Sequence, residues 1–157
     1  MPGLAGVFNT DNSNGDIGHL LNEMCQVMKH ETWYKQDIFI DEMVGIGRIS
    51  LGILNPETQP IFNEDKTLCI MMDGEIYDYQ DRKQELASRG HRFSVDNDPE
   101  FILHLYEEYG NDFVHKLNGA FALAILNRAK QEIVIVNDRY GLRPSYYAKH
   151  GGKFVQS

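Results

Sequence analysis

The order of apolar and polar positions predicts helices and strands that are largely segregated along the chain. Apolar residues at helical spacing predict helices over 17–29 and 99–109, and a polar helix is expected over 79–88 before Gly90. A further short helix is expected over 111–117. Short apolar runs between turn residues predict strands. These runs are 4–8, 37–43, 45–51, 68–72, 121–126, 132–136, 145–148 and 153–155.

This order favours an α+β fold with mainly antiparallel sheets. The run 121–126 is apolar at every position, so we expect both of its faces to be covered. Two sheets stacked face to face with helices outside would provide that cover. No linker or repeat divides the 157 residues, so one domain over 1–157 is expected.

Charge and composition narrow the classes of protein. The formal net charge of −8 repels phosphate backbones and anionic membranes, so nucleic acid and membrane partners are not expected. The chain has no basic leader and no run of roughly 18 apolar residues, which predicts a cytoplasmic protein. Cys25 and Cys69 lie in apolar segments and are expected to be buried, reduced thiols.

The histidines show no spacing that is typical of a metal site. His104 is expected to be a partly exposed surface residue of the helix over 99–109, and we expect no metal.

The apolar strand that begins almost at the first residue is more informative about function. Chain ends usually fray, so a buried start indicates that the terminus is held in place for a purpose.

Six short motifs follow one another along nearly the whole chain. They are Gly-Leu-Ala-Gly-Val-Phe at 3–8, Gly-Arg-Ile-Ser at 47–50 with Gln-Pro at 59–60, Asp-Gly-Glu-Ile-Tyr at 73–77, Asn-Asp-Pro-Glu at 97–100, Leu-Asn-Gly-Ala-Phe-Ala at 117–122 and Asp-Arg-Tyr-Gly-Leu-Arg-Pro at 138–144. Together they resemble the glutamine-hydrolysing N-terminal domain of the asparagine synthetase family. Those domains are class II glutamine amidotransferases with the N-terminal-nucleophile hydrolase fold.

The resemblance implies a four-layer αββα sandwich, and a truncated as well as a complete C-terminal end is compatible with it. It also implies a nucleophilic cysteine as the first residue after removal of Met1, with the free α-amine as its base. This chain has Pro2 at that position, which offers a ring of methylenes and no thiolate. Cys25 and Cys69 do not look placed to replace it.

A second departure lies at Asp73, where the family usually has Asn before Gly as the oxyanion-stabilising pair. An ionised carboxylate would repel a developing oxyanion, and losing one such donor costs roughly 100- to 1,000-fold in rate. Gly74 can still offer a backbone donor. The alternative interpretation of Asp73-Gly74 is a plain turn.

The positions that would bind the amino-acid end of glutamine persist, so glutamine or a similar amino acid remains a possible ligand. Arg48 matches the family arginine that pairs with the α-carboxylate, Asp98 the acid that meets the α-ammonium, and Glu75 the acid after the motif glycine. Two of the three have a plainer alternative: Arg48 can be a strand-edge arginine, and Asp98 before Pro99 can be a helix N-cap.

Two hypotheses about function follow. The first is a catalytically silent glutaminase-like domain, a binding or scaffolding module for an ATP-dependent amide-forming synthetase. The second is an active or formerly active glutaminase domain with its cysteine substituted, or an enzyme that uses the Pro2 amine as a base. Relatives carry ATP and Mg²⁺ in a ligase domain with a Ser-Gly-Gly-x-Asp-Ser loop, which these 157 residues lack, so no cofactor is expected here. A fragment and a stand-alone product both remain open, as does a homodimer.

Overall fold

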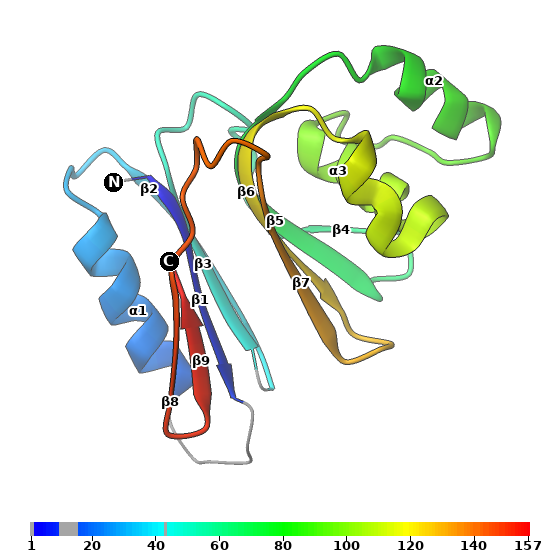
Figure 1. Cartoon of the computed structure of the whole chain (residues 1–157). Coiled ribbons are helices and arrows are strands. Elements are labelled where there is room, and N and C mark those ends of the chain that lie inside the picture. The colour runs from blue at the N-terminus through cyan, green and yellow to red at the C-terminus, as the bar shows by residue number, and fades with distance from the viewer. Residues whose placement is uncertain (1, 10–15, 43) are drawn as a thin grey trace.

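Two stacked β-sheets lie between helices in this protein, whose computed structural model describes residues 2–9, 16–42 and 44–157 (Figure 1). The elements in chain order are β1 (Gly3–Asn9), α1 (Ile17–Met28), β2 (Lys35–Asp41), β3 (Val44–Ser50), β4 (Ile61–Phe62), β5 (Leu68–Ile76), α2 (Gln80–Ser88), α3 (Asp98–Tyr109), the 3₁₀ helix η1 (Gly110–Lys116), β6 (Gly119–Asn127), β7 (Glu132–Asn137), β8 (Tyr147–His150) and β9 (Lys153–Gln156).

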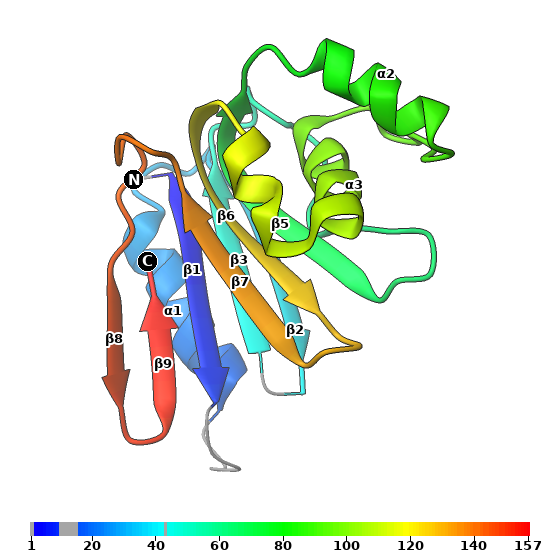
Figure 2. The same cartoon turned by 45° about the vertical axis from the view of Figure 1, so that its right-hand side comes forward.

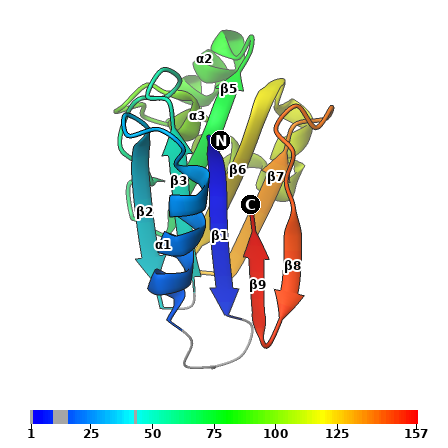
Figure 3. The same cartoon turned by 90° about the vertical axis from the view of Figure 1, so that its left-hand side faces the viewer.

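The first sheet has the order β2-β3-β1-β9-β8 and the second β4-β5-β6-β7, with antiparallel pairing throughout. Helix α1 covers the outer face of the first sheet (Figure 3), and α2 and α3 lie outside the second (Figure 2). The predicted four-layer αββα sandwich is therefore confirmed. No helix in the described ranges is long and apolar enough to cross a membrane.

Three hydrophobic layers hold the four structural layers together, as the alternation of strand side chains requires. Leu4 and Phe8 of β1 pack between the sheets, whereas Ala5 and Val7 pack against α1. The largest layer lies between the second sheet and α3. Because β1 is the middle strand of its sheet, the apolar start of the chain belongs to the core.

Strand β5 extends further than its apolar run indicated. The apolar run predicted a strand that ends at residue 72, but residues 73–76 pair with Ala122 to Gly119 of β6 and complete the strand. The interpretation of Asp73-Gly74 as a plain turn was therefore wrong. Period-two alternation continues through this segment, which places Asp73 and Glu75 on the same face as Met71, between the two sheets.

The prediction for His104 was also wrong. This side chain is 2% exposed and lies between α3 and the loop that follows α2. The predictions for both cysteines are confirmed, because Cys25 and Cys69 are buried and free. Burial raises the pKa of each thiol to about 11.

Candidate functional site

The start of β1 and the end of β5 lie at the same end of the sandwich (Figures 1 and 3). Hydrogen bonds and an ion pair place Arg48, Asp73 and Asp98 among the segments that meet there. Leu4 pairs in register with Arg48 of β3, and Leu4 packs between the sheets. Alternation continued back by two residues places half-buried Pro2 on that same face. The strand arrangement therefore directs positions 2, 48, 73 and 75 toward one space between the sheets.

Arg48 is 1% exposed, and its two terminal nitrogens are fully engaged. Nη1 donates to Asp37 Oδ2 at 3.3 Å and to the Glu57 carbonyl at 3.1 Å. Nη2 donates to the carbonyls of Leu54 at 3.1 Å and Asn55 at 2.6 Å. Burial lowers the Arg48 pKa, and the charge of Asp37 opposes that shift. In this conformation Arg48 ties the 52–57 loop to the first sheet.

Asp98 connects the start of α3 to the end of β5. Its Oδ2 accepts hydrogen bonds from the Ile76 backbone N at 3.0 Å and from Asn55 Nδ2 at 3.2 Å. Asn55 Oδ1 in turn accepts from the Asp98 backbone N at 3.2 Å. The Tyr79 side chain also forms a hydrogen bond with the Asp98 carboxylate. Burial and the negative charge of Asp98 together raise the Tyr79 pKa to about 12.

The alternative role of Asp98 as the N-cap of α3 was wrong. Asn97 is the cap, and its side chain accepts from the Glu100 backbone N at 3.0 Å. Pro99 lies one position further into the helix than predicted. The Asp98 carboxylate therefore does not cap the helix. It contacts the end of β5 and the 52–57 loop instead.

Asp73 is buried and forms an ion pair with Arg143, whose Nη1 lies 2.9 Å from Asp73 Oδ2. Burial raises the pKa of Asp73, and the charges of Arg143 and Arg48 act in the opposite direction. The position expected to stabilise an oxyanion therefore carries a carboxylate that is already paired with a cation.

Arg143 lies in a turn that the Asp138 side chain stabilises. The Asp138 side chain, 3% exposed, accepts from the backbone N of Tyr140 and Leu142 at 3.0 Å each and of Arg143 at 2.9 Å. Asp138 was not among the predicted site residues. Its signal was available, since an aspartate that begins a turn commonly binds backbone N–H groups a few residues ahead.

Gly74 and Glu75 lie near the end of β5, next to the candidate site. Gly74 has φ +112°, and a Cβ there would lie 2.0 Å from the Ala120 carbonyl oxygen, so the strand pairing requires glycine. Its carbonyl accepts from Asn55 Nδ2 at 3.0 Å. Glu75 is half-buried and bonds to the Tyr77 hydroxyl.

Asn55 is the residue that sequence reasoning missed most completely. It contacts Gly74 and Asp98 through its side chain and Arg48 through its carbonyl, and so joins three of the predicted positions. Its φ of +45° is a conformation that asparagine adopts more readily than most residues.

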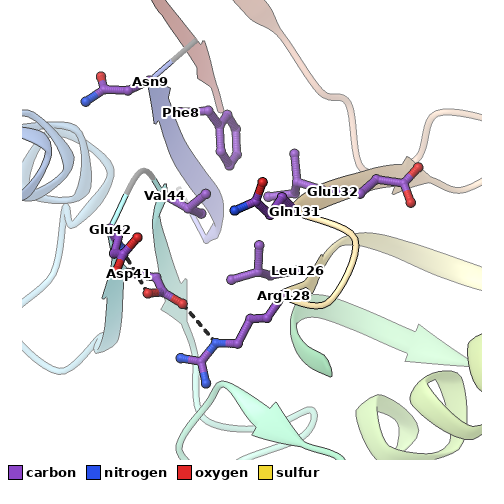
Figure 4. A pocket seen from close by; sticks show the side chains of 10 residues that line it. Phe8, Asn9, Asp41, Glu42, Val44, Leu126, Arg128, Gln131 and Glu132 are labelled. Atoms are coloured by element: carbon purple, nitrogen blue, oxygen red, sulfur yellow. Dashed lines mark hydrogen bonds and ion pairs between the residues drawn. The ribbon is translucent and has the colours of Figure 1, made fainter. Parts of the chain in front are cut away.

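A separate cavity of about 770 Å³ opens at the opposite end of the sandwich (Figure 4). Its walls include Phe8 and Val44 from the first sheet and Ile133 from the second. Asp41 Oδ2 lies 2.8 Å from Arg128 Nε at its edge. None of the predicted site residues lines this cavity, and the five residues 3–7 of β1 separate Phe8 on its wall from Pro2.

The fold and the site together define a sandwich whose central N-terminal strand leads into an inter-sheet site, as in N-terminal-nucleophile hydrolases. Comparisons with known proteins agree. The family model described as "Glutamine amidotransferase domain" matches residues 1–157. The glutamine phosphoribosylpyrophosphate amidotransferase of B. subtilis has a similar fold, with a TM-score of 0.77 at 17% identity over 98% of this chain and 41% of that one.

Proteins that are similar in sequence define the family more narrowly. Asparagine synthetase [glutamine-hydrolyzing] 2 of Bacillus subtilis is 35% identical over 153 residues, which cover 95% of this chain and 20% of the relative. Asparagine synthetase [glutamine-hydrolyzing] 2 of Arabidopsis thaliana is 38% identical over 149 residues, covering 93% and 25% respectively. This chain belongs to the class II glutamine amidotransferase domain family of the asparagine synthetase type. It spans a fifth to a quarter of the length of these relatives.

Proposed function

We propose that this domain has lost glutamine hydrolysis and acts as a binding or scaffolding module for an ATP-dependent amide-forming synthetase. Pro2 at the head of β1 is the observation that carries the proposal. Covalent amide hydrolysis requires a heteroatom that attacks the carbonyl carbon. The proline ring has no thiol or hydroxyl, and the buried Cys25 and Cys69 have raised pKa values that disfavour the thiolate.

The ion pair between Asp73 and Arg143 supports the same proposal independently. A tetrahedral intermediate needs donors that point at its oxyanion. The Asp73 carboxylate is an acceptor, and it holds the nearest Arg143 nitrogen at 2.9 Å. Restoring a nucleophile at position 2 alone would therefore leave the second deficiency in place.

Retention of a glutamine-binding pocket is part of this proposal, with Asp98 and Glu75 as the contacts for the ammonium group. Arg48 could bind a carboxylate through both terminal nitrogens only if its hydrogen bonds to the carbonyls of Leu54 and Asn55 were broken. Glutamine binding through Arg48 therefore requires the 52–57 loop to move. No cofactor is proposed for the candidate glutamine site, because ATP and Mg²⁺ chemistry would belong to the synthetase partner.

The partner proposal rests on length. The relatives are four to five times longer than the matched segment, and their names describe amide synthesis coupled to glutamine hydrolysis. A synthetase domain or subunit is therefore the proposed partner. A cytoplasmic location is proposed as well, supported by two free thiols, which are typical of reducing compartments.

The test is to incubate the purified chain with glutamine and measure glutamate, ammonia and any glutamyl adduct by mass spectrometry. We expect neither turnover nor adduct from the unmodified protein or from Pro2→Cys, and measurable turnover from Pro2→Cys combined with Asp73→Asn. Turnover by the unmodified chain would overturn the loss of hydrolysis. Activity of Pro2→Cys alone would favour the alternative, a working glutaminase domain in which only the cysteine was substituted.

Calorimetric titration with glutamine tests the pocket separately from the chemistry. We expect binding that Asp98→Asn weakens by about tenfold or more, corresponding to the loss of one charge-assisted contact. Asp96→Asn, two residues before Asp98 on the exposed loop, is the matched control and should bind as the unmodified chain does. Absence of heat in every protein would remove the binding role and leave scaffolding alone.

A further inference from the structure

Three side chains with metal-ligating atoms converge on the far side of the second sheet from the site described above. His104 and Glu107 are one turn apart on α3, and His91 lies in the loop that follows α2. His104 Nδ1 is 2.9 Å from Glu107 Oε2 and 3.1 Å from His91 Nδ1, and His91 Nδ1 is 3.5 Å from Glu107 Oε2. The three ligand atoms therefore lie within 3.5 Å of one another.

The hydrogen bond on the other ring nitrogen of His104 determines which atom carries a lone pair. Nε2 lies 3.0 Å from the Arg92 carbonyl oxygen, which can only accept, so Nε2 bears the hydrogen. In the neutral ring Nδ1 is then an unprotonated acceptor, and it faces a carboxylate oxygen and a second ring nitrogen. Such an arrangement is favourable when a cation lies between the three atoms.

The separations match a tetrahedral zinc site. Ligands that bind Zn²⁺ at 2.0–2.1 Å with tetrahedral angles lie roughly 3.3 Å from one another. The three observed separations, 2.9, 3.1 and 3.5 Å, scatter around that value. Two imidazoles and one carboxylate are a common ligand set for this ion, which leaves the fourth position for water.

The surroundings orient the ligands as a metal site requires. Asn63 Nδ2 donates to Glu107 Oε1 at 2.9 Å, which leaves Oε2 directed at the histidines. The Arg92 carbonyl fixes the His104 ring, and Phe93 packs edge-on against it with centroids 4.9 Å apart. Partners of this kind set the tautomer and basicity of metal ligands. Glu64 adds a further negative charge nearby.

We propose that His91, His104 and Glu107 bind a divalent transition-metal ion, with Zn²⁺ the best match. A bound ion would join the loop after α2 to α3, because one ligand comes from the loop and two from the helix. The ion would lie on the far side of the second sheet from the candidate site, so it would act on the contact between this loop and α3. This inference is independent of whether the domain hydrolyses or binds glutamine.

The experiment titrates the full chain, freed of metal by a chelator, with Co²⁺ as a spectroscopic probe and then with Zn²⁺. We expect one Co²⁺ per chain with the intense visible bands of tetrahedral coordination, displaced by one Zn²⁺. Thermal unfolding should shift upward with Zn²⁺. His91→Ala and Glu107→Gln should each weaken binding by about a hundredfold, and Asn63→Ala by about tenfold through the carboxylate it orients.

Two matched controls keep the test decisive. His19→Ala removes a histidine from an exposed His19–Glu23 pair, and Glu108→Gln removes the acid next to Glu107 that pairs with Arg89. Both should bind metal as the unmodified chain does. Circular dichroism checks that each variant is folded. Absence of stoichiometric binding, as expected if the cluster holds only a proton, would overturn the proposal, as would unchanged binding by folded His91→Ala and Glu107→Gln.

Discussion

Asp73 Oδ2 lies 2.9 Å from Arg143 Nη1, so two residues 70 positions apart form an ion pair at the end of the sandwich where the chain begins. The carboxylate comes from the end of β5 and the guanidinium from the turn that Asp138 holds. This relationship puts a buried negative charge beside the expected catalytic position, and its energetic cost can be measured.

Asp73→Asn should stabilise the protein at neutral pH. Burial holds the folded-state pKa of Asp73 above its ordinary value, so ionisation is less favourable in the folded than in the unfolded chain. The variant removes that cost, and Arg143, whose side chain is 35% exposed, can be solvated instead. The stability gain should therefore grow as pH rises from about 3, below the ordinary aspartate pKa, to neutrality.

Melting temperatures of the two proteins, measured across that pH range, provide the check. A variant less stable than the unmodified chain at neutral pH would show that the attraction to Arg143 outweighs desolvation. A difference that does not change with pH would show that Asp73 titrates normally. Either result contradicts the assignment of burial as the dominant cause.

Gly74→Ala should destabilise the domain far more than Gly90→Ala. Both glycines have positive φ, +112° and +106°, so both substitutions carry a backbone cost of roughly 1–2 kcal/mol. At Gly74 the new Cβ also meets the Ala120 carbonyl at 2.0 Å, whereas nothing lies within 4 Å at Gly90. We expect a total loss of about 3 kcal/mol or more at Gly74. Urea unfolding compares the two, and equal losses would rule out the steric contribution.

Arg48→Lys should lower the free energy of unfolding, because lysine cannot donate hydrogen bonds to the carbonyls of Leu54, Asn55 and Glu57 at once. Disrupting a buried, paired charge of this kind costs roughly 3–5 kcal/mol. Arg139→Lys, on the exposed turn, is the control and should change the free energy of unfolding by less than about 0.5 kcal/mol. Similar effects of the two substitutions in denaturant titrations would contradict a structural role for Arg48.

Both cysteines should resist thiol reagents in the folded protein. Their side chains are 0% and 1% exposed, and burial raises each pKa to about 11, so little thiolate exists near pH 8. Ellman's reagent should detect no fast-reacting thiol before denaturant is added and two per chain afterwards. Rapid labelling of either residue in the folded state would contradict this prediction.

Much of the candidate site could be named from sequence, but the roles of its residues could not. The motifs indicated Arg48, Asp73 and Asp98, and the structure brings all three to one end of the sandwich. Whether Arg48 is free or engaged depends on where the 52–57 loop lies, which no local pattern encodes. Asn55 was missed for the same reason, because its contacts are with residues 19 and 43 positions away.

His104 shows how local periodicity can mislead. Its position on the helix was predicted, but the side chain is covered by the loop at 91–93, and this loop is placed by the packing of α2 and α3. The extension of β5 has a similar cause. The local sequence Asp73-Gly74 is typical of a turn, but pairing with β6 makes both residues part of the strand.

The sequence alone indicated the order of the helices and strands apart from the short β4, the apolar faces that stack two sheets between helices, and the proline that precedes the first strand. These are properties of neighbouring residues and of their periodicity along the chain. Tertiary structure decided that Asp73 meets Arg143, that Asn55 joins Gly74 to Asp98, and that His91 reaches His104 and Glu107. Such pairs depend on strand register and loop placement, which are fixed when separate segments pack together.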